Sequence, residues 1–315
     1  MICLRLVVAG DLTDRVLDTL AADPAVAHVA LERGASLRPA GDVIVADVAR
    51  EAASALIDRL EALGLADSGA IFATESAVAL SRAADAAEAA APGDPSEAVV
   101  WQEVAAKTGE ETRLSVTFLL FLVIAMVIAS LGVLLDQPIL IVGAMVVGPE
   151  FGPLAALCLA LVERDRRGVG GSLLALGVGF TVGGVVTVLT TFLLTALGLV
   201  GRGMLLAERP LTDFIWRPDA LSWIVALLAG VAGILSLTTA KSGALVGVLI
   251  SVTTVPAAAN AAVAFAYGVP AEATGSLVQL GLNLSAIIVA GVSTIGAQRL
   301  LARSAQRASD RTTAR

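Results

Sequence analysis

The pattern of hydrophobic and polar residues divides the chain near residue 113. Before this point, apolar residues occur in short runs, either alternating as in strands or spaced three to four apart as in helices. After it, they fill runs of about 20 residues, the length that a helix needs to cross the hydrocarbon core of a bilayer. The pattern therefore predicts a soluble N-terminal region followed by an α-helical polytopic membrane region.

The first 76 residues combine four strand-like runs with two amphipathic helical patterns. We expect strands at 2–9, 25–32, 42–48 and 68–76 and helices at 11–22 and 49–64. Turn-forming residues fill 33–42, between the second and third strands. The order of these elements predicts a ferredoxin-like (βαββαβ) α+β domain over residues 1–76, located in the cytoplasm.

Residues 77–113 connect the two regions. The part up to residue 97 is rich in Ala, Glu, Pro and Gly, which is typical of a linker. The part from 97 to 113 predicts a helix with one apolar side that includes Trp101. This helix either lies at the membrane interface, with Trp101 near the headgroups, or is a plain connecting helix.

The region 114–297 holds six apolar runs, which we interpret as six transmembrane helices. They cover 114–135, 138–162, 171–200, 220–240, 243–268 and 273–297, and a basic tail follows at 298–315. Lys and Arg are concentrated on one side of these spans, at Arg113, the cluster from Arg164 to Arg167, Lys241 and the tail. The positive-inside rule then predicts a plasma-membrane protein with both termini in the cytoplasm. No signal-peptide pattern opens the sequence.

An internal repeat is visible when the chain is compared with itself at a spacing of 104 residues. The segment GSLLALG (171–177) aligns with GSLVQLG (275–281), and Pro153 meets Pro256 with one residue of slip. Spans one to three therefore resemble spans four to six. Because three is an odd number of spans, the second copy must enter the membrane from the opposite side. We expect a 3+3 inverted-topology repeat, as in many secondary transporters.

The stretch GAMVVGPEFGP interrupts the second span with residues that a membrane helix rarely holds at its centre. Pro149 lacks a backbone N–H and clashes with the carbonyl group four residues earlier, and Pro153 has the same effect one turn later. Gly148 and Gly152 relax the backbone further. We therefore expect a broken or kinked helix, with Glu150 near the middle of the span.

The fifth span carries a matching proline and a group of polar residues. The residues are Thr253, Thr254, Pro256 and Asn260, and the sixth span adds Asn283. Freed backbone groups must be buried in protein or line a wet cavity, and an ionisable residue at membrane depth indicates a functional site. We expect a substrate or ion site where spans two and five meet, with Glu150 as its titratable or cation-binding group. Gln279 and Thr181 are further candidate contacts.

A structural interpretation of the same residues stays open. Gly and Pro are common in membrane helices, and small residues allow close helix packing. Glu150 would then be a hydrogen-bonded structural residue, or would lie at a subunit interface.

Composition and charge limit the other function classes. The chain is 57% hydrophobic and only 16% charged, and residues 1–98 carry 7 Lys or Arg against 16 Asp or Glu. This acidic balance argues against nucleic acid as a partner. Cys3, Cys158 and His28 have no spacing typical of a metal site. No nucleophile–base pair, Walker loop or nucleotide fingerprint is present, so we expect no enzyme activity, no metal and no cofactor.

The segment SLGVLLDQPILIVGAMVVGPEFGPLAAL (130–157), the helix around VVWQEV, and GALVGVLISVTTVPAAANAAVAF (243–265) resemble a bacterial hydrophobic family, domain of unknown function 389. The resemblance covers roughly 100–297, and the N-terminal region is similar to one that many members carry. Pro149, Gly152 and Pro153 match the family motif, whereas Glu150 and Phe151 depart from it. The resemblance implies a membrane domain but names no activity.

Two functions from different classes fit these observations. The first is a transporter or channel for an ion or small polar solute, with the N-terminal domain in a regulatory or assembly role. The alternative is a membrane-anchored sensor or scaffold whose ferredoxin-like domain binds a ligand or partner. Both predict a chain in contact with the lipid bilayer and a homo-oligomer. The broken spans favour the first, because a simple anchor does not need them.

Overall fold

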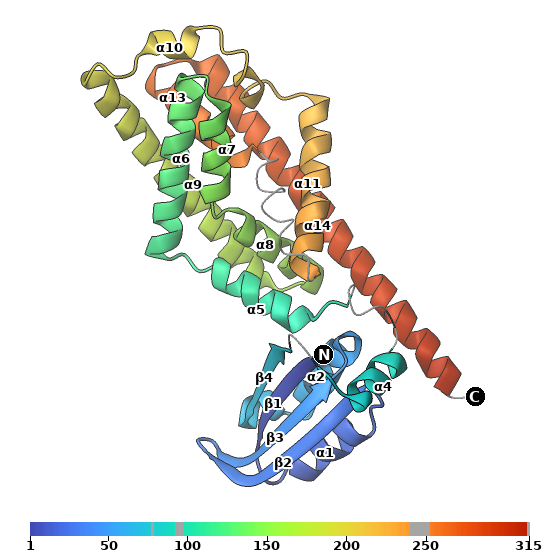
Figure 1. The fold of residues 1–315 in the computed structure, drawn as a ribbon. Coiled ribbons are helices and arrows are strands. Elements are labelled where there is room, and N and C mark those ends of the chain that lie inside the picture. Colours follow the sequence, from blue (N-terminus) through green and yellow to red (C-terminus); the bar gives the residue numbers. More distant parts are fainter. Residues whose placement is uncertain (77–78, 92, 94–97, 240–252, 314–315) are drawn as a thin grey trace. The chain divides into compact units, whose positions relative to one another are not determined.

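The structure is a computed structural model, and it describes residues 1–76, 79–91, 93, 98–239 and 253–313 (Figure 1). The chain divides into two compact units. The first is made up mainly of Met1–Val104, and the second contains Ala105–Leu237 and the described residues from 253 to 299.

The N-terminal unit is built on a four-stranded antiparallel sheet with the strand order β2-β3-β1-β4. Its elements are β1 (Ile2–Val8), α1 (Thr13–Ala21), β2 (Val26–Leu37), β3 (Ala40–Val48), α2 (Arg50–Ala62), α3 (Leu65–Ser68) and β4 (Ala70–Glu75). This is the predicted βαββαβ order, with one additional helical turn, α3, before β4. Alternate residues of β1 and β3, such as Leu4, Leu6 and Ile44, are fully buried and pack with residues of the two helices, including Leu56.

The hairpin of β2 and β3 is longer than the sequence predicts. The expected turn over 33–42 is mostly strand, and the chain reverses only at 38–39. Gly34 lies at an irregularity in the ladder and has a φ of +67°, a conformation that favours glycine. Its N–H donates to Asp42 Oδ1 at 2.7 Å, and Thr13 Oγ1 donates to Asp42 Oδ2 at 2.7 Å. These hydrogen bonds, that of Thr13 first, lower the pKa of Asp42.

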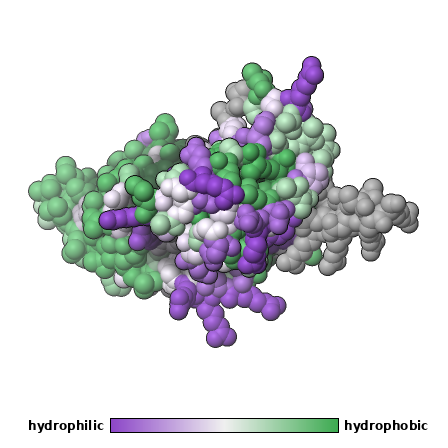
Figure 2. Space-filling model, turned by 90° about the horizontal axis from the view of Figure 1, so that it is seen from below, coloured by the Kyte–Doolittle hydropathy of each residue, from purple (hydrophilic) through white to green (hydrophobic). Residues whose placement is uncertain are grey.

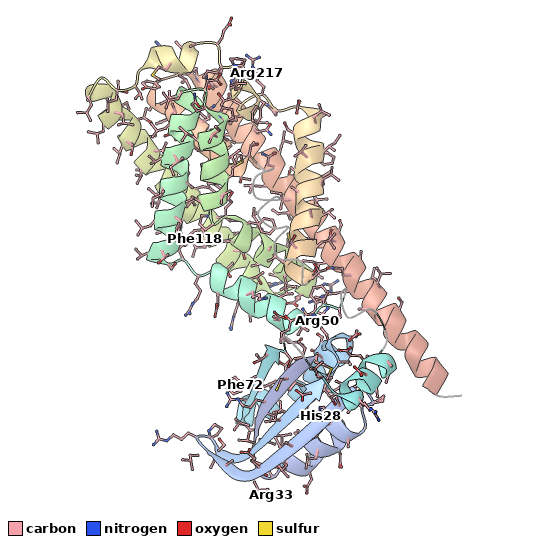
Figure 3. All side chains as sticks on the ribbon, in the orientation of Figure 1. His28, Arg33, Arg50, Phe72, Phe118 and Arg217 are labelled. Atoms are coloured by element: carbon pink, nitrogen blue, oxygen red, sulfur yellow. The ribbon has the colours of Figure 1, made fainter. Side chains whose placement is uncertain are left out.

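The segment predicted as a linker contains helix α4 (Arg82–Ala90), which lies against β2 and β3. Its alanine-rich sequence has high helix propensity, and Ser81 caps it by accepting a hydrogen bond from the Ala83 N–H. Helix α5 (Trp101–Glu111) follows, and Val100, just before it, is buried in the core of the N-terminal unit. Arg50, labelled in Figure 3, donates to the carbonyl oxygen of Ala98 at 3.1 Å and ties this segment to the unit.

The second unit consists of helices, several of which are highly apolar. They are α6 (Val116–Leu134), α7 (Pro138–Val147), α8 (Phe151–Glu163), α9 (Arg166–Ala196), α10 (Arg202–Leu206), the 3-10 turn η1 (Asp213–Ile215), α11 (Ala220–Thr238), α13 (Thr254–Ala266) and α14 (Pro270–Thr313). Within the described residues, four helices are long and apolar enough to cross a membrane, namely α6, α9, α11 and the part of α14 up to Ala302. The bent pair of α7 and α8 would be a fifth span.

The fifth predicted span, 243–268, is described only in part. Residues 243–252 lie outside the described residues, and the remainder contains α13, a helix of 13 residues. The sixth predicted span, 273–297, is part of α14, which continues into the predicted tail. Large apolar side chains such as Leu189, Phe192 and Leu193 are exposed on α9. Hydrophobic residues form continuous areas of the surface in Figure 2, as expected for helices that face lipid.

The second span is interrupted between Val147 and Phe151, where α7 and α8 meet at a bend of 52°. Pro149 lies within this break, where its missing N–H is tolerated. Pro153 does not add a second break, contrary to the sequence prediction. It is the third residue of α8, and Pro256 is likewise the third residue of α13. The first four N–H groups of a helix have no intrahelical acceptor, so prolines at these positions begin a helix without disturbing it.

Candidate functional site

The residues directly before α8 and α13 bring two helix N-termini together. Glu150 precedes α8 and Thr253 precedes α13, and neither side chain caps its own helix. Instead, Thr254 Oγ1 donates a hydrogen bond of 2.7 Å to Glu150 Oε1. Both residues are buried, with exposed fractions of 5% for Glu150 and 1% for Thr254. The acid predicted from the sequence is therefore enclosed in protein, at the break in the second span.

Gly148 provides the space that the Glu150 carboxylate occupies. A Cβ atom placed on Gly148 would lie 2.4 Å from Glu150 Oε2 and 2.9 Å from Val255 Cγ2. Real Cβ contacts do not occur at such distances, so any larger residue at 148 would displace the carboxylate or the start of α13. The Glu150 carboxylate can thus occupy its position only because residue 148 is a glycine.

Helix α14 contributes two amides beside the start of α13. Asn283 Nδ2 donates to Thr253 Oγ1 at 2.9 Å, and Gln279 Nε2 donates to Asn283 Oδ1 at 3.2 Å. Both amides are buried, with exposed fractions of 2% and 1%. We call the five residues Glu150, Thr253, Thr254, Gln279 and Asn283 the midpoint cluster.

Two acceptor atoms of the midpoint cluster have no hydrogen-bond partner among the described residues. They are Glu150 Oε2 and Gln279 Oε1, and both are inaccessible to solvent. No ion pair with Lys, Arg or His involves Glu150 in the described part of the chain. A buried acceptor without a donor is costly, so these atoms indicate where a ligand would be stabilised.

Two predicted contacts do not belong to the midpoint cluster. Thr181 Oγ1 donates to the carbonyl oxygen of Gly177 on its own helix, and its side chain is exposed. Asn260 is buried further along α13, where its Nδ2 donates to Glu272 Oε1 at 3.0 Å and to Ser276 Oγ at 2.8 Å. The predicted site residues Gly152, Pro153 and Pro256 are buried in the first turns of α8 and α13 and shape these helices.

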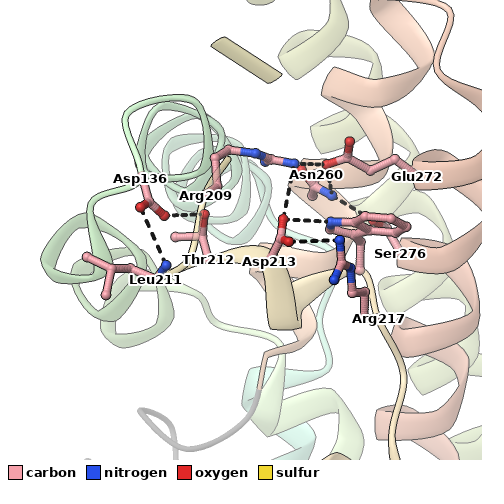
Figure 4. Close-up of polar contacts among 10 residues, drawn as sticks. Asp136, Arg209, Leu211, Thr212, Asp213, Arg217, Asn260, Glu272 and Ser276 are labelled. Carbon is pink, nitrogen blue, oxygen red and sulfur yellow. Dashed lines mark hydrogen bonds and ion pairs between the residues drawn. The ribbon is translucent and has the colours of Figure 1, made fainter. Parts of the chain in front are cut away.

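Asn260 is part of a second polar group, buried at its centre and shown in Figure 4, which we call the loop cluster. Its centre is an ion pair between Arg209 and Glu272, with exposed side-chain fractions of 3% and 6%. Asp213 lies 4.0 Å from Arg209 and accepts from Trp216 Nε1 at 3.2 Å. The loop cluster consists of Arg209, Asp213, Trp216, Asn260, Glu272 and Ser276.

The ion pair of the loop cluster is not predicted from the sequence. Arg209 lies between two predicted spans, at 171–200 and 220–240, and Glu272 lies 63 residues further along the chain. The one available signal was an acidic residue directly before the apolar run 273–297, which a buried arginine would have to neutralise.

Comparison with known proteins confirms the resemblance inferred from the sequence. Residues 145–289, which include the whole midpoint cluster, match the family described as "Domain of unknown function (DUF389)". The chain is also 24% identical over 201 residues to "Uncharacterized protein MJ0678" of the archaeon Methanocaldococcus jannaschii. This match covers 61% of the chain and 59% of the relative. No solved structure matches. Over residues 145–289, then, the chain is similar to the DUF389 family, whose description names no activity.

Proposed function

We propose that the protein is a plasma-membrane transporter or channel for an ion or a small polar solute, with its site at the midpoint cluster. The observation that carries the proposal is a buried glutamate held between the starts of two short helices, with one carboxylate oxygen left unpaired among the described residues. The N-terminal unit would serve regulation or assembly. The alternative, a sensor or scaffold, gains nothing from an acid buried among apolar helices.

The helix bounds support the inverted repeat on which this proposal depends. Helices α6 and α11 each have 19 residues, and α11 begins and ends 104 residues after α6. Helix α14 begins 104 residues after α9, at Pro270 and Arg166. Helices α8 and α13 each have 13 residues and begin 103 apart. A repeat of this length predicts that helices recur at this spacing.

Contacts within each half recur at the same spacing. A Cβ atom on Gly183 of α9 would lie 2.4 Å from Met126 Sδ of α6. In the second half, a Cβ atom on Gly230 of α11 would lie 3.0 Å from Ile287 Cα of α14. Positions 230 and 287 follow 126 and 183 by 104 residues, with the small and large residues exchanged. In both halves a glycine allows the first and third helices to approach closely.

Contacts between the halves are reciprocal. Glu163, the last residue of α8, forms an ion pair with Arg299 of α14. Tyr267, which follows α13, shares a hydrogen bond of 2.7 Å with Thr195 of α9. Tyr267 and Arg299 lie 104 residues after Glu163 and Thr195. In each half, therefore, the end of the short helix contacts the long helix of the other half. Two-fold symmetry produces such reciprocal contacts.

Glu150 and Thr254 are themselves 104 residues apart and contact one another. Equivalent positions of two symmetric halves meet only at the symmetry axis. The repeat would thus centre on the Glu150–Thr254 contact. In transporters built from inverted repeats, broken helices at the interface of the halves form the site for substrate and coupling ions. The positive-inside rule adds that both termini lie in the cytoplasm.

Reconstitution into liposomes tests the proposal. Proton and monovalent-cation fluxes would be recorded with fluorescent indicators for the wild-type protein, for Glu150→Gln and for Glu208→Gln. Glu208 is an exposed acid of the same unit and serves as the matched control. We expect flux in the wild type and in Glu208→Gln, and at least a tenfold loss in folded Glu150→Gln. Equal flux in Glu150→Gln and the wild type would contradict the proposed site. No flux in the wild type would favour the sensor.

A further inference from the structure

We infer that the midpoint cluster binds a dehydrated monovalent metal cation, with the Glu150 carboxylate as its charged ligand. This inference rests on the proposed function and adds the class of ligand to it. Four features of the cluster carry it: the balance of donors and acceptors, the net charge, the chemistry of the oxygen atoms and the apolar surroundings.

The balance of donors and acceptors in the midpoint cluster leaves acceptors in excess. The Thr254 hydroxyl and the amide groups of Asn283 and Gln279 each donate to an oxygen of the cluster. The two buried atoms of the cluster without a partner among the described residues are both acceptors, Glu150 Oε2 and Gln279 Oε1. A ligand that satisfies them must supply positive charge or hydrogen-bond donors.

The charge of the cluster selects between these ligands. Glu150 is the one ionisable side chain of the five, so the ionised cluster carries a single negative charge. An anion would be repelled, and a neutral molecule would leave a charge uncompensated in apolar surroundings, which is unfavourable. A monovalent cation neutralises the carboxylate, whereas a divalent cation would leave an excess positive charge. The residues packed near the starts of α8 and α13, Val255, Ala258 and Ala259 among them, are buried and apolar.

The N-termini of α8 and α13 lie beside Glu150, which directly precedes α8 and accepts a hydrogen bond from Thr254, the first residue of α13. Unsatisfied N–H groups at a helix start favour negative charge, so they favour the carboxylate over a cation as their immediate neighbour. The cation itself would be held by oxygen atoms, from the carboxylate, the Gln279 amide and the threonine hydroxyls. Such oxygen ligands suit hard cations, of which Na⁺, Li⁺ and K⁺ are the monovalent examples.

Thermal unfolding of the purified full chain in detergent tests the inference without any membrane gradient. Chloride concentration and ionic strength would be held constant while Na⁺, Li⁺ or K⁺ replaces choline, a bulky organic cation. For the wild type, we expect the unfolding temperature to rise and saturate with at least one metal cation. Glu150→Gln should lose this rise. Thr254→Val should increase the half-maximal concentration about tenfold, since its hydroxyl orients the carboxylate. Glu208→Gln should behave as the wild type does.

Three results would overturn the inference. The first is that no metal cation raises the unfolding temperature of the wild type above its value in choline. The second is an equal rise of the unfolding temperature in folded Glu150→Gln. The third is an unfolding temperature that depends on pH alone, which would mean that Glu150 holds a proton. If the first or third result is found together with solute flux in liposomes, the proposed transport function stands and the metal-cation site is rejected. Saturable stabilisation by a metal cation without flux would support the cation site and argue against transport.

Discussion

Glu150 and Glu272 are both buried in the helical unit, but their surroundings differ. Glu272 forms an ion pair with Arg209 and accepts a hydrogen bond from Asn260. Glu150 Oε1 accepts one hydrogen bond, from the Thr254 hydroxyl group, and Oε2 has no partner among the described residues. An acid whose charge is neutralised by the protein stabilises a fold, whereas an acid without a counter-charge is available to a ligand. The comparison therefore separates a structural cluster from a candidate binding site.

The loop cluster also links chain segments that lie far apart in the sequence. Arg209 and Asp213 belong to the connection between α9 and α11, while Asn260 and Glu272 belong to α13 and α14. The same connection contacts the turn between α6 and α7, where Thr212 Oγ1 donates to Asp136 Oδ1 at 2.9 Å (Figure 4). We therefore assign the loop cluster a structural role.

Removal of the buried arginine should have the largest effect on stability. Arg209→Met leaves Glu272 buried without a counter-charge, and we expect the free energy of unfolding to fall by about 3–5 kcal/mol. Denaturant unfolding in detergent would measure this change. The double variant Arg209→Met/Glu272→Leu should recover most of the loss, because no charge then remains unpaired. A single variant as stable as the wild type would contradict the assigned role.

Steric crowding at the break should have an intermediate effect. We expect Gly148→Ala to lower the free energy of unfolding by about 1–3 kcal/mol, because its methyl group meets the Glu150 carboxylate and Val255. Gly143→Ala, in the same span, is the matched control, since a Cβ atom there meets nothing within 4 Å. The same assay would compare the two. Equal stabilities would show that the carboxylate does not occupy the space over Gly148.

Neutralisation of Glu150 should have a small effect, in contrast to disruption of the ion pair of Glu272. In choline buffer, without metal cations, Glu150→Gln should be as stable as the wild type or more stable by up to about 1 kcal/mol. The reason is that Gln is neutral without a bound proton or cation and keeps an acceptor for Thr254. Glu272→Gln should be clearly destabilised, because the buried Arg209 then keeps only the more distant carboxylate of Asp213, at 4.0 Å. Comparable losses in the two variants would place both acids in structural roles.

The smallest effect is expected in the N-terminal unit, at Asp42. Hydrogen bonds from Thr13 and Gly34 lower the pKa of this carboxyl group in the folded state. Its stabilising contribution is therefore complete above the usual aspartate pKa of about 3.9 and is lost as the pH falls through the lower folded-state value. Hydrogen exchange of the β2–β3 hairpin, measured in the full chain between about pH 5 and pH 2.5, should show this loss. Asp42→Asn should abolish it, and Asp14→Asn, which changes an exposed acid, should not.

Local patterns predicted much of the fold, and long-range contacts account for what they missed. Alternation and helical spacing predicted the βαββαβ order, and Pro149 predicted the interruption before Phe151. The extent of the β2–β3 hairpin was not predictable, because it depends on Asp42, eight residues beyond Gly34. The contacts of Asn260 were not predictable from local patterns, since its partner Glu272 is reached only when α14 folds back along α13.

Carbodiimide labelling of Glu150 and Glu272 in one sample would compare the two buried acids and show whether Glu150 is the one available to a ligand. Carbodiimides react with protonated carboxyl groups in apolar surroundings, and peptide mass spectrometry locates the modified residue. We expect Glu150 to be labelled in choline buffer, a metal cation to slow this labelling, and ion-paired Glu272 not to be labelled in the folded protein. Labelling of Glu272 at the rate of Glu150 would show that the two acids do not differ, and labelling of Glu150 that no cation slows would rule out a cation at Glu150.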